Sequence, residues 1–350
     1  MTRPSRPSST ALQQALRRLS GGDSLNEAET ETAFGEIMAG VAPAPSIGEL
    51  LLAMRARGET APEIAGAVRA LRSAMVVVSS RNIDQLVDTC GTGGGRVTTL
   101  NLSTAAAFVA AGAGVRVAKH GNRSFTSRSG SADVLEALGL SLDLVPEQAA
   151  TVLDSVGLVF LFAQAYHPAM RHVAPIRREL GVTTLMNLVG PLANPAGARR
   201  QVVGVADRSR APVVAEALVR LGARHALVVH ADVGMDEISP LGNTLIWEVR
   251  EGGVQEMQLD PATLGLAAPS LQGLEGGEPE ENAVKIEALL REPSSAAPAL
   301  RAAVVLNAAA AVYVSGVGRG WKEAAIAATA ALESGAAVAT LDTLRRVAGR

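Results

Sequence analysis

The chain is 350 residues long and 48% of its residues are hydrophobic, which is enough for two lobes with substantial cores and excludes an extensively disordered protein. Its 32 basic and 34 acidic side chains leave a formal net charge of −2, which argues against a nucleic-acid binder held by bulk electrostatics, so any anion site must be local. Cys90 is the only cysteine, which excludes an intrachain disulfide and a cysteine-based zinc cluster and suits the reducing cytoplasm, where we expect the protein.

Residues 10–80 are predicted to form a small helical domain, after a disordered leader at 1–9 that is rich in Arg, Ser and Pro. The segments Ser46–Glu49 and Thr60–Glu63 read as capping boxes, and Gly58 ends the helix between them. An apolar stripe follows that is more typical of packing than of chemistry, formed by Ile64, Val68, Leu71 and Met75.

From residue 81 to 350 the pattern predicts an α/β domain with a mostly parallel central sheet, because short β-rich runs alternate with helical segments. The segment 261–298 is expected to hold loops and one helix, and Val304–Val314 and Glu323–Leu332 to be packed helices. No stretch reaches the roughly 18 uninterrupted apolar residues that span a bilayer, so no membrane partner is expected. The predicted strands are Leu86–Cys90, Val115–Ala118, Val159–Phe162, Gln201–Val205, Ala226–His230 and Thr244–Val249.

A glycine loop follows the first predicted strand. Its glycines between Gly91 and Gly95 leave backbone N–H groups uncovered, and Ser103 and Thr104 can cap the alanine-rich helix behind them. Amides and a positive helix end together favour an anion. A bare glycine loop is weak evidence, since such a loop often only turns the chain.

A second polar cluster follows the apolar run Val115–Ala118, at the predicted carboxyl end of a strand. In open α/β sheets, ligands bind in the crevice outside these ends. Lys119 is one of only three lysines in a chain that otherwise uses arginine, so it is not a random solubilising charge. The two clusters together predict a ligand that carries phosphate. The members of the second cluster are Lys119, His120, Asn122, Arg123, Ser124, Ser127 and Ser131.

These motifs resemble the anthranilate phosphoribosyltransferases, of the nucleoside-phosphorylase-like phosphoribosyltransferase class. The resemblance covers about residues 10–345. The motifs that carry it are GTGG at 91–94, TxNxST at 99–104, KHGNRxxxSxSGSAD at 119–133, HPAMRHVAPIRRELG at 167–181, NLVGPLANP at 187–195, GVADRS at 204–209, HALVVH at 225–230 and MDEISP at 235–240.

The resemblance implies a fold and a reaction. The fold is the nucleoside phosphorylase/phosphoribosyltransferase type, in which a segment at about 165–190 rejoins the helical domain. The reaction transfers 5-phosphoribose from phosphoribosyl pyrophosphate (PRPP) to the amine of anthranilate and releases pyrophosphate, in tryptophan biosynthesis. Such chemistry needs amides, cations and metal at the leaving group and no obligatory nucleophile. A homodimer through the helical domain is also implied, for which the apolar stripe offers a surface.

The resemblance also assigns the donor site. Asp236 and Glu237 hold Mg²⁺ on the pyrophosphate and Ser103 contributes to a second ion, so two ions per subunit are expected. Without the DEISP context, adjacent loop carboxylates read as solvated. Lys119 supplies fixed positive charge, and His120 orients the substrate. The implied PRPP site is Gly91, Gly94, Gly95, Thr99, Asn101, Leu102, Ser103, Thr104, Lys119, His120, Gly121, Asn122, Arg123, Ser124, Phe125, Thr126, Ser127 and Ser131.

For the acceptor, the family-matched residue is Arg177, which would grip the anthranilate carboxylate by a charge-assisted contact. Without the family it reads as an ordinary helix-surface arginine beside Arg178. Asn122 would place the amine side of the ring, and Gly91 and His167 complete the acceptor set. The histidines also read as core or turn residues.

The chain departs from the family in the glycine loop, which commonly reads GTGGD and then glycine but here has Gly95 and Arg96. A carboxylate is missing near the expected metal-bound pyrophosphate. We therefore hypothesise that PRPP still binds but with altered magnesium dependence, and that Arg96 offers charge to the leaving group. Three alternatives stay open: a pyrimidine nucleoside phosphorylase of the same fold, a non-catalytic relative that binds nucleic acid, and a transferase with another aromatic amine as acceptor.

Overall fold

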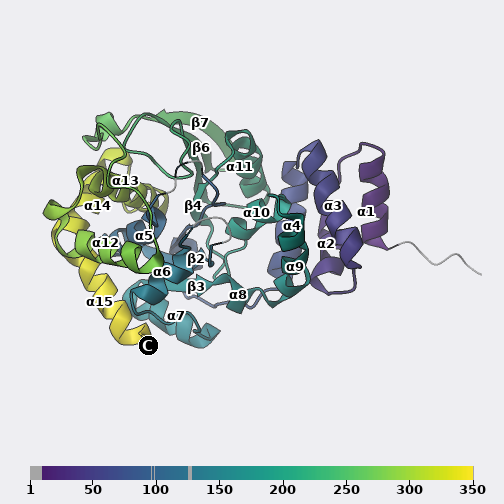
Figure 1. Ribbon diagram of the computed structural model, residues 1–350, viewed down its shortest axis with the longest axis horizontal. Helices are drawn as coiled ribbons and strands as arrows, with labels where there is room; N and C mark the ends of the chain where they lie inside the picture. The colour runs from purple at the N-terminus through teal and green to yellow at the C-terminus, as the bar shows by residue number, and fades with distance from the viewer. Residues whose placement is uncertain (1–9, 96, 98, 125–127, 350) are drawn as a thin grey trace, which may run out of the picture. The chain divides into compact units, whose positions relative to one another are not determined.

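The computed structural model describes residues 10–95, 97, 99–124 and 128–349, and the chain forms two compact units. One is helical and combines the residues up to Met75 with 167–193; the other is α/β and combines 76–166 with 194–350 (Figure 1). The segment 167–193 therefore belongs with the N-terminal helices, although it follows three strands of the α/β unit. The predicted leader lies outside the described residues.

The helical unit packs the N-terminal helices against short helices of the returning segment. α3 contacts α9, and α10 contacts both α3 and α4. Its helices are α1 (Ala11–Ser20), α2 (Glu27–Met38), α3 (Ala44–Arg57), α4 (Ala61–Ser73), η2 (Pro168–His172), α9 (Ala174–Leu180), α10 (Leu185–Val189) and η3 (Gly190–Leu192).

Helix ends in this unit follow capping chemistry. Gly58, in the left-handed region at φ 92°, ends α3 as predicted. The N–H of Thr60 donates to Glu63 Oε2 at 2.9 Å, so the predicted capping box of α4 is confirmed. The other predicted box is wrong. α3 begins at Ala44, because a proline in its first turn presets the helical φ, and Ser46 therefore lies inside the helix.

Three of the four residues of the predicted apolar stripe lie in the core, whereas Met75 follows α4 and is half-buried. Ile64, Val68 and Leu71 are buried, and α4 packs on α2 and α10 of the same unit. The prediction that Ile64, Val68 and Leu71 serve packing is therefore correct. The stripe cannot serve as a dimer surface, which corrects that part of the homodimer prediction.

The α/β unit is built on one seven-stranded sheet in the order β3-β2-β1-β4-β5-β6-β7. The first five strands in this order are mutually parallel, while β6 pairs antiparallel with both β5 and β7. The predicted mostly parallel sheet is therefore correct. The strands are β1 (Leu86–Thr89), β2 (Arg116–Gly121), β3 (Leu158–Phe162), β4 (Arg200–Gly204), β5 (His225–Ala231), β6 (Thr244–Arg250) and β7 (Gly253–Leu259).

Strand β2 runs three residues further than predicted. Lys119 and His120 pair with Phe160 and Leu161 of β3, so they belong to the strand and not to the loop after it. Both side chains are buried, because parallel strands are covered on both faces.

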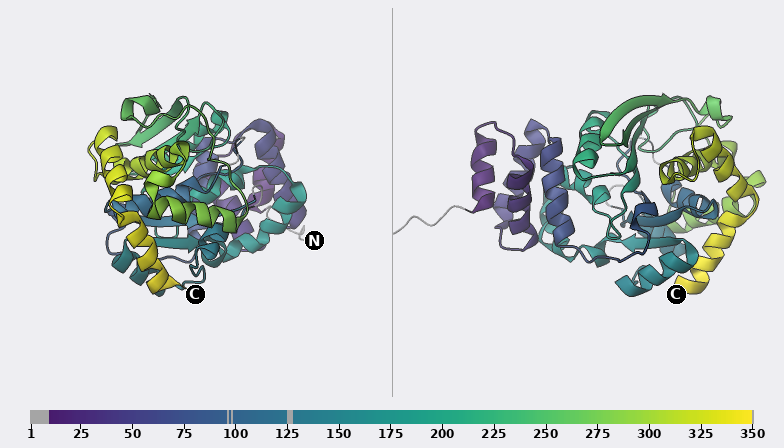
Figure 2. Two further views of the ribbon diagram at one scale, coloured as in Figure 1. Left: turned by 60° about the vertical axis from the view of Figure 1, so that its left-hand side comes forward. Right: turned by 180° about the vertical axis from the view of Figure 1, so that it is seen from behind.

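Helices cover both faces of this sheet. α13 contacts β1, β4 and β5, whereas α11 contacts β5, β6 and β7. The two helices lie on opposite sides of the strands in Figure 1 and in the right-hand view of Figure 2. The helices of this unit are η1 (Ile83–Gln85), α5 (Leu102–Gly112), α6 (Ser131–Ala137), α7 (Pro146–Val156), α8 (Ala163–Tyr166), η4 (Arg208–Arg210), α11 (Ala211–Arg220), η5 (Pro261–Leu264), α12 (Pro279–Arg291), η6 (Pro293–Ser295), α13 (Pro298–Ser315), α14 (Trp321–Glu333) and α15 (Ala336–Ala348).

Helix α13 is long and apolar enough to cross a membrane by length and composition, but 78% of it is buried inside the protein. It packs on α5 and α14 as well as on the sheet. Burial of this kind is what the central helix of a folded core shows.

Candidate active site

The glycine loop leaves β1 and is held against the end of β4. The N–H of Thr92 donates to the carbonyl of Gly204 at 2.8 Å, and a Cβ on Gly91 would lie 3.0 Å from that carbonyl oxygen. Gly93 and Gly94 have φ values of 65° and 84°, in the left-handed region where glycine is favoured. The backbone of both is exposed, so the loop offers main-chain amides at the carboxyl edge of the sheet.

The acidic pair lies against this loop and the start of α5. Glu237 Oε2 accepts from Thr99 Oγ1 and Glu237 Oε1 accepts from the N–H of Ser103, each at 3.0 Å. The carboxylate of Asp236 accepts a hydrogen bond from the N–H of Gly93. The chain thus brings together groups that are more than 130 residues apart in sequence.

Lys119 completes this cluster from β2. Its Nζ donates to the carbonyl of Thr89 at 2.5 Å and to Ser103 Oγ at 3.2 Å. Burial lowers the pKa of Lys119, and the nearby Cys90, Asp88 and Glu237 oppose that shift. Ser103 therefore lies between the ammonium of Lys119 and the carboxylate of Glu237.

The positive charge near the two carboxylates does not compensate for their burial, and the pKa of each is raised. Burial, and then the charge of Asp236, raise the pKa of Glu237 to about 8; burial also raises the pKa of Asp236. Lys119 is the cation that acts on Glu237 from within the protein. A pair of half-buried carboxylates beside a hydroxyl is a set of hard oxygen donors that suits a divalent cation such as Mg²⁺.

The loop that carries the acidic pair is fixed by Asn307, on the buried helix α13. Asn307 Oδ1 accepts from the N–H of Ile238 at 3.0 Å, and its Nδ2 donates to the carbonyl of Ile238 at 2.9 Å. Asn307 is a buried amide, and sequence reasoning did not find this partner. An asparagine inside an otherwise apolar helix is the signal that could have found it.

Asn101 and Thr99 are tied to the segment 261–298, in which the sequence predicted only loops and one helix. Asn101 Oδ1 accepts from Asn282 Nδ2 of α12 at 3.0 Å, and its Nδ2 donates to the carbonyl of Ser129 at 3.1 Å. Asn282 in turn accepts from the N–H of Gly277 at 2.8 Å. Asn101 thus joins three segments around the site. Nothing in the Pro-, Gly- and Glu-rich composition near Asn282 indicated this role.

Asp88 is a second buried group that the sequence analysis missed. Its Oδ1 accepts from the N–H of His120 at 3.0 Å and its Oδ2 from Asn194 Nδ2 at 2.8 Å. Asn194 also donates to the carbonyl of Ala118 at 2.8 Å. Burial raises the pKa of Asp88 to about 6. Asn194 belongs to the NLVGPLANP motif. Together with Asp88 it connects β1 to β2 close to Lys119.

Arg123 is already paired. Its guanidinium lies 2.7 Å from Asp133 and 2.5 Å from Glu136 of α6, and 5.6 Å from the centre of the Phe162 ring. These carboxylates raise the pKa of Arg123. Its positive charge is thus largely neutralised by α6. The N–H of Ser124 donates to Asp133 Oδ2 at 3.3 Å, which ties the same segment to α6.

Asn122 and Ser131 adjoin each other. Ser131 Oγ donates to the carbonyl of Asn122 at 3.3 Å, and Asn122 Oδ1 accepts from the N–H of Arg123 at 2.8 Å. A Cβ on Gly121 would lie 2.2 Å from Ser131 Oγ, so glycine is required there. Phe125, Thr126 and Ser127 lie outside the described residues, as does Arg96 in the glycine loop.

The predicted caps of α5 are wrong. The helix begins at Leu102 with Asn101 as its N-cap, so Ser103 and Thr104 lie inside the first turn. Leu102 and Thr104 are buried. The N–H of Ser103 still points out of the helix end and is the group that meets Glu237.

Gly95 gives room to Asp236. A Cβ at position 95 would lie 2.8 Å from Asp236 Oδ1 and 3.4 Å from its backbone nitrogen. The missing carboxylate of the family loop therefore coincides with a site where the side chain of Asp236 closes in. Gly204 is packed closer still, since a Cβ there would lie 1.7 Å from the carbonyl oxygen of Asp236.

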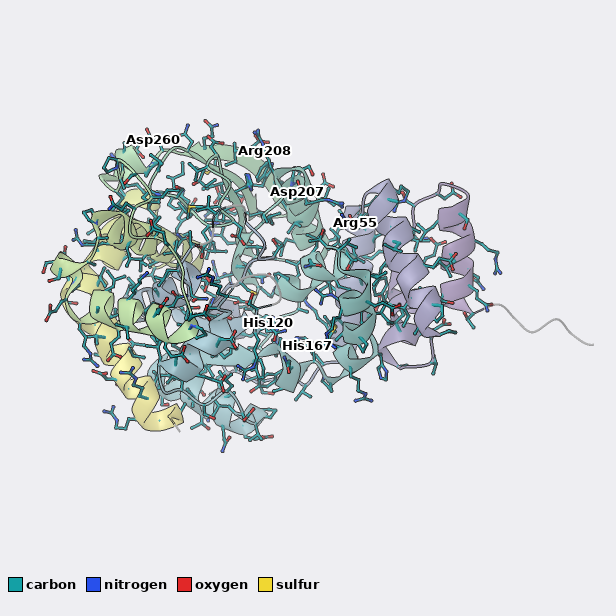
Figure 3. The ribbon with its side chains drawn as sticks, viewed as in Figure 1. Arg55, His120, His167, Asp207, Arg208 and Asp260 are labelled. Carbon is teal, nitrogen blue, oxygen red and sulfur yellow. The ribbon has the colours of Figure 1, made fainter. Side chains whose placement is uncertain are left out.

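The two residues expected to meet anthranilate from the returning segment belong to the helical unit. His167 precedes η2 and is buried, and burial lowers its pKa to about 4, so it is neutral at pH 7. Arg177 lies on α9 and is half-buried, which lowers its pKa, whereas Arg178 beside it is exposed. Figure 3 labels His167 in this unit and His120 on β2 of the other.

Two family models match the chain. The model described as the a/b domain of a glycosyl transferase family matches residues 83–338, and the helical bundle domain of the same family matches residues 13–75. An anthranilate phosphoribosyltransferase from Rubrobacter xylanophilus is 49% identical over 343 residues, which cover 97% of this chain and 99% of the relative. One from Methanosarcina acetivorans is 44% identical over 95% of this chain and 89% of its own length.

Solved structures show the same likeness. The anthranilate phosphoribosyltransferase of Thermus thermophilus superposes with a TM-score of 0.89 at 43% identity, over 95% of this chain and 98% of that one. The enzyme of Saccharomyces cerevisiae in complex with PRPP and Mg superposes with a TM-score of 0.87 at 26% identity, over 96% and 97% of the two chains. A further structure of the yeast enzyme holds 4-fluoroanthranilate.

Fold, site and family models together define a glycosyltransferase of the pentosyl-transferring kind, and the chain belongs to this glycosyl transferase family. Within the family, it belongs with the anthranilate phosphoribosyltransferases.

Proposed function

We infer that the protein transfers the 5-phosphoribosyl group of PRPP to the amine of anthranilate and releases pyrophosphate, as a step of tryptophan biosynthesis. The observation that carries this inference is the cluster beside the glycine loop in which Ser103 is hydrogen-bonded to both Lys119 and Glu237, whose charges interact. The similarity to transferases along almost the whole chain supports it.

The leaving pyrophosphate is the charge that the site must stabilise, and the residues for it are cations and amides. The ammonium of Lys119 is fixed at the end of β2 and needs no reorganisation as negative charge develops. The exposed backbone of Gly94 offers an amide donor on the same edge, next to the N–H of Gly93 that is donated to Asp236. We assign the diphosphate of PRPP to these groups.

Asp236, Glu237 and Ser103 fit Mg²⁺, because they offer half-buried hard oxygens and the pKa of each carboxyl is raised. When bound, Mg²⁺ would neutralise phosphate charge at this edge. Within the described part of the chain, no group of three or more His, Cys, Asp or Glu side chains gathers to hold a metal. The substrate phosphates would supply further ligands, and we propose two ions per subunit.

The remaining predicted residues complete the proposed PRPP site. Those on the glycine loop and α5 surround the diphosphate, and those after β2 surround the ribose phosphate. The first group is Gly91, Gly94, Gly95, Thr99, Asn101, Leu102, Ser103 and Thr104, and the second is His120, Gly121, Asn122, Arg123, Ser124, Phe125, Thr126, Ser127 and Ser131.

For anthranilate, we propose that Arg177 pairs with the carboxylate, that Asn122 and Gly91 adjoin the amine side, and that neutral His167 lines the ring. The half-burial of Arg177 supports this role, since partial desolvation strengthens a charge-assisted pair. We propose that the two compact units are the two domains of each subunit. We also propose that two subunits form a cytoplasmic homodimer, each through its helical unit. Exposed apolar side chains on that unit, Val41, Leu52 and Val182, offer surface for the contact.

Two matched reactions test this function. The protein is supplied with anthranilate, PRPP and Mg²⁺ in one and with thymidine and phosphate in the other. The first should release pyrophosphate as the fluorescence of anthranilate is lost, and the second should give no product. Turnover of thymidine, or of neither pair, contradicts the assignment. Replacing anthranilate with other aromatic amines tests the acceptor.

Variants locate the chemistry. Lys119→Met should lower kcat by about 100-fold or more, the usual effect of removing a preorganised charge from an active site. Glu237→Gln should weaken the response to Mg²⁺, whereas Glu280→Gln on the exposed face of α12 should behave like the wild type. Equal rates for Lys119→Met and the wild type would contradict the placement of the diphosphate.

A further inference from the structure

A cavity of about 520 Å³ lies at the edge of the sheet opposite to the glycine loop, and arginine side chains dominate its lining. The residues used below are Arg200, Arg224, His225, Arg250, Tyr313 and Arg319. This volume is within the ordinary range for small-molecule sites, about 300–1,000 Å³.

The sheet register explains why these cations meet. Arg200 begins β4 and is paired with His225, the first residue of the parallel strand β5. His225 is also paired with Arg250, the last residue of the antiparallel strand β6. Three strands therefore deliver their charged ends to one edge. β5 spans about 20 Å from His225 to the edge at Ala231, so the cavity is separate from the acidic pair that follows β5.

The positive charges in the cavity have little compensation. The guanidinium of Arg200 donates to the carbonyls of Asp84, at 2.9 Å, and Val314, and the charge of the Asp84 carboxylate acts on it without a direct ion pair in the described part of the chain. Burial, and then the charges of Arg224 and Arg250, lower the pKa of Arg200, while the charge of Asp84 opposes that shift. Like charges therefore face one another here.

The carboxylates that pair with Arg224 and Arg250 do so at long range and in contact with solvent. Arg224 lies 3.8 Å from Asp84, and Arg250 lies 3.7 Å from Glu251, whose side chain is 87% exposed at the rim. In the described part of the chain, the side chain of Arg319 has no ion pair. Exposed pairs of this geometry contribute little, so the arginines keep most of their capacity to bind an anion.

The wall of the cavity is rigid. The ring of Tyr313 packs edge-on against His225 at 4.9 Å and against Trp321 at 5.2 Å between centroids. Tyr313 Oη and His225 Nε2 both lie within hydrogen-bond distance of Glu248 Oε1, at 2.8 and 2.7 Å. Glu248 is thereby engaged by the wall, and its charge also interacts with that of Arg250. The cavity is preorganised and does not have to order its aromatic side chains when a ligand enters.

We propose that this arginine-lined cavity binds a small polyvalent anion, one that carries phosphates or several carboxylates, at a site separate from the transferase centre. Several guanidinium groups in one concave site are the means by which proteins recognise such groups bidentately. The ligand enters from the amino ends of the parallel strands, while PRPP chemistry uses the carboxyl ends.

Trp321 gives a direct readout. The chain has two tryptophans, and Trp247→Phe leaves Trp321, which touches the cavity wall, as the only one. This protein is titrated without Mg²⁺ with tripolyphosphate and, separately, with citrate, and calorimetry on the unmodified chain repeats the titrations. We expect a saturable signal, and the anion that binds more tightly tells phosphate from carboxylate ligands.

Variants assign the signal to the cavity. The double variant Arg224→Ala/Arg250→Ala should weaken binding by about tenfold or more, because it removes charge-assisted hydrogen bonds. The charge-matched control Arg17→Ala/Arg81→Ala, at two exposed positions elsewhere, should bind like the parent chain. Lys119→Met should also bind normally, and the double variant should keep its phosphoribosyl transfer.

Three results would overturn the proposal. One is the absence of saturable binding of either anion to the unmodified chain by both methods. Another is equal weakening in the double variant and its charge-matched control. The third is loss of binding in Lys119→Met with the double variant unaffected, which would place the anion in the transferase centre.

Discussion

Asn307 offers a way to disturb the acidic loop without touching a proposed ligand of substrate or metal. Asn307→Leu removes both hydrogen bonds to Ile238 and leaves its buried N–H and carbonyl unpaired. Each such group costs about 1–3 kcal/mol, so the expected loss of unfolding free energy for the two is roughly 2–6 kcal/mol. Because Ile238 directly follows Glu237, the Mg²⁺ concentration for half-maximal rate should also rise, by about tenfold for each 1.4 kcal/mol lost at the site.

Urea unfolding and the rate as a function of Mg²⁺ measure the two effects. Val305→Ala, a buried position on the same helix, is the matched control: it should lower stability by roughly 1–3 kcal/mol through a cavity and leave the Mg²⁺ response unchanged. The reasoning fails if Asn307→Leu loses less than about 1 kcal/mol, or if both variants shift the Mg²⁺ response equally.

Three further predictions concern single residues. Gly95→Asp should lower the Mg²⁺ concentration for half-maximal rate by about tenfold, since it adds a carboxylate beside Asp236, while the uncharged Gly95→Asn should not; superimposable curves for wild type and Gly95→Asp refute it. Arg177→Ala should raise the KM for anthranilate and leave PRPP binding nearly intact, with exposed Arg178→Ala as control; an unchanged KM in steady-state kinetics contradicts the carboxylate assignment. Because burial lowers the pKa of His167 from 6.5 to about 4, the unfolded chain takes up a proton there before the folded one does, so the stability that neutral His167 contributes is complete above about pH 6.5 and decreases by roughly 2–3 kcal/mol towards pH 4.5. In His167→Asn this part of the slope should vanish, and equal slopes in urea unfolding between pH 7 and 4.5 would show that His167 does not titrate this way.

The strands that sequence could predict are those with buried, apolar runs. β1, β3, β4 and β5 were found nearly to their ends, because both faces of a parallel sheet are covered. β7 was missed since it pairs only with β6 and its residues Gly253 to Gln258 are almost all exposed, so no apolar alternation marks it. Lys119 and His120 were predicted to follow β2, because their polar side chains were taken to mark its end. The strand in fact continues through them to Gly121.

Capping-box patterns predicted a helix start correctly in one case and wrongly in the other, depending on the neighbouring residues. Thr60 with Glu63 caps α4, but Ser46 with Glu49 has the same spacing and lies inside α3, because a proline upstream starts that helix earlier. A four-residue pattern cannot tell these cases apart.

The groups that bear charge in the candidate site could be named from sequence motifs, whereas the groups that hold them could not. Asp88, Asn194 and Asn282 are single polar residues within apolar or mixed segments, and their partners lie up to 181 residues away. Their hydrogen bonds depend on which strands are adjacent, and a single sequence does not state the strand order.

The most direct test of the account is whether the glycine loop, Lys119 and the acidic pair bind one diphosphate together with Mg²⁺. Titration calorimetry of PRPP into the protein, with and without Mg²⁺, measures this for the wild type, Glu237→Gln and the control Glu280→Gln. The account predicts Mg²⁺-dependent binding in the wild type and the control, and affinity weaker by about tenfold or more in Glu237→Gln. Equal PRPP affinity in all three proteins, with or without Mg²⁺, would contradict it.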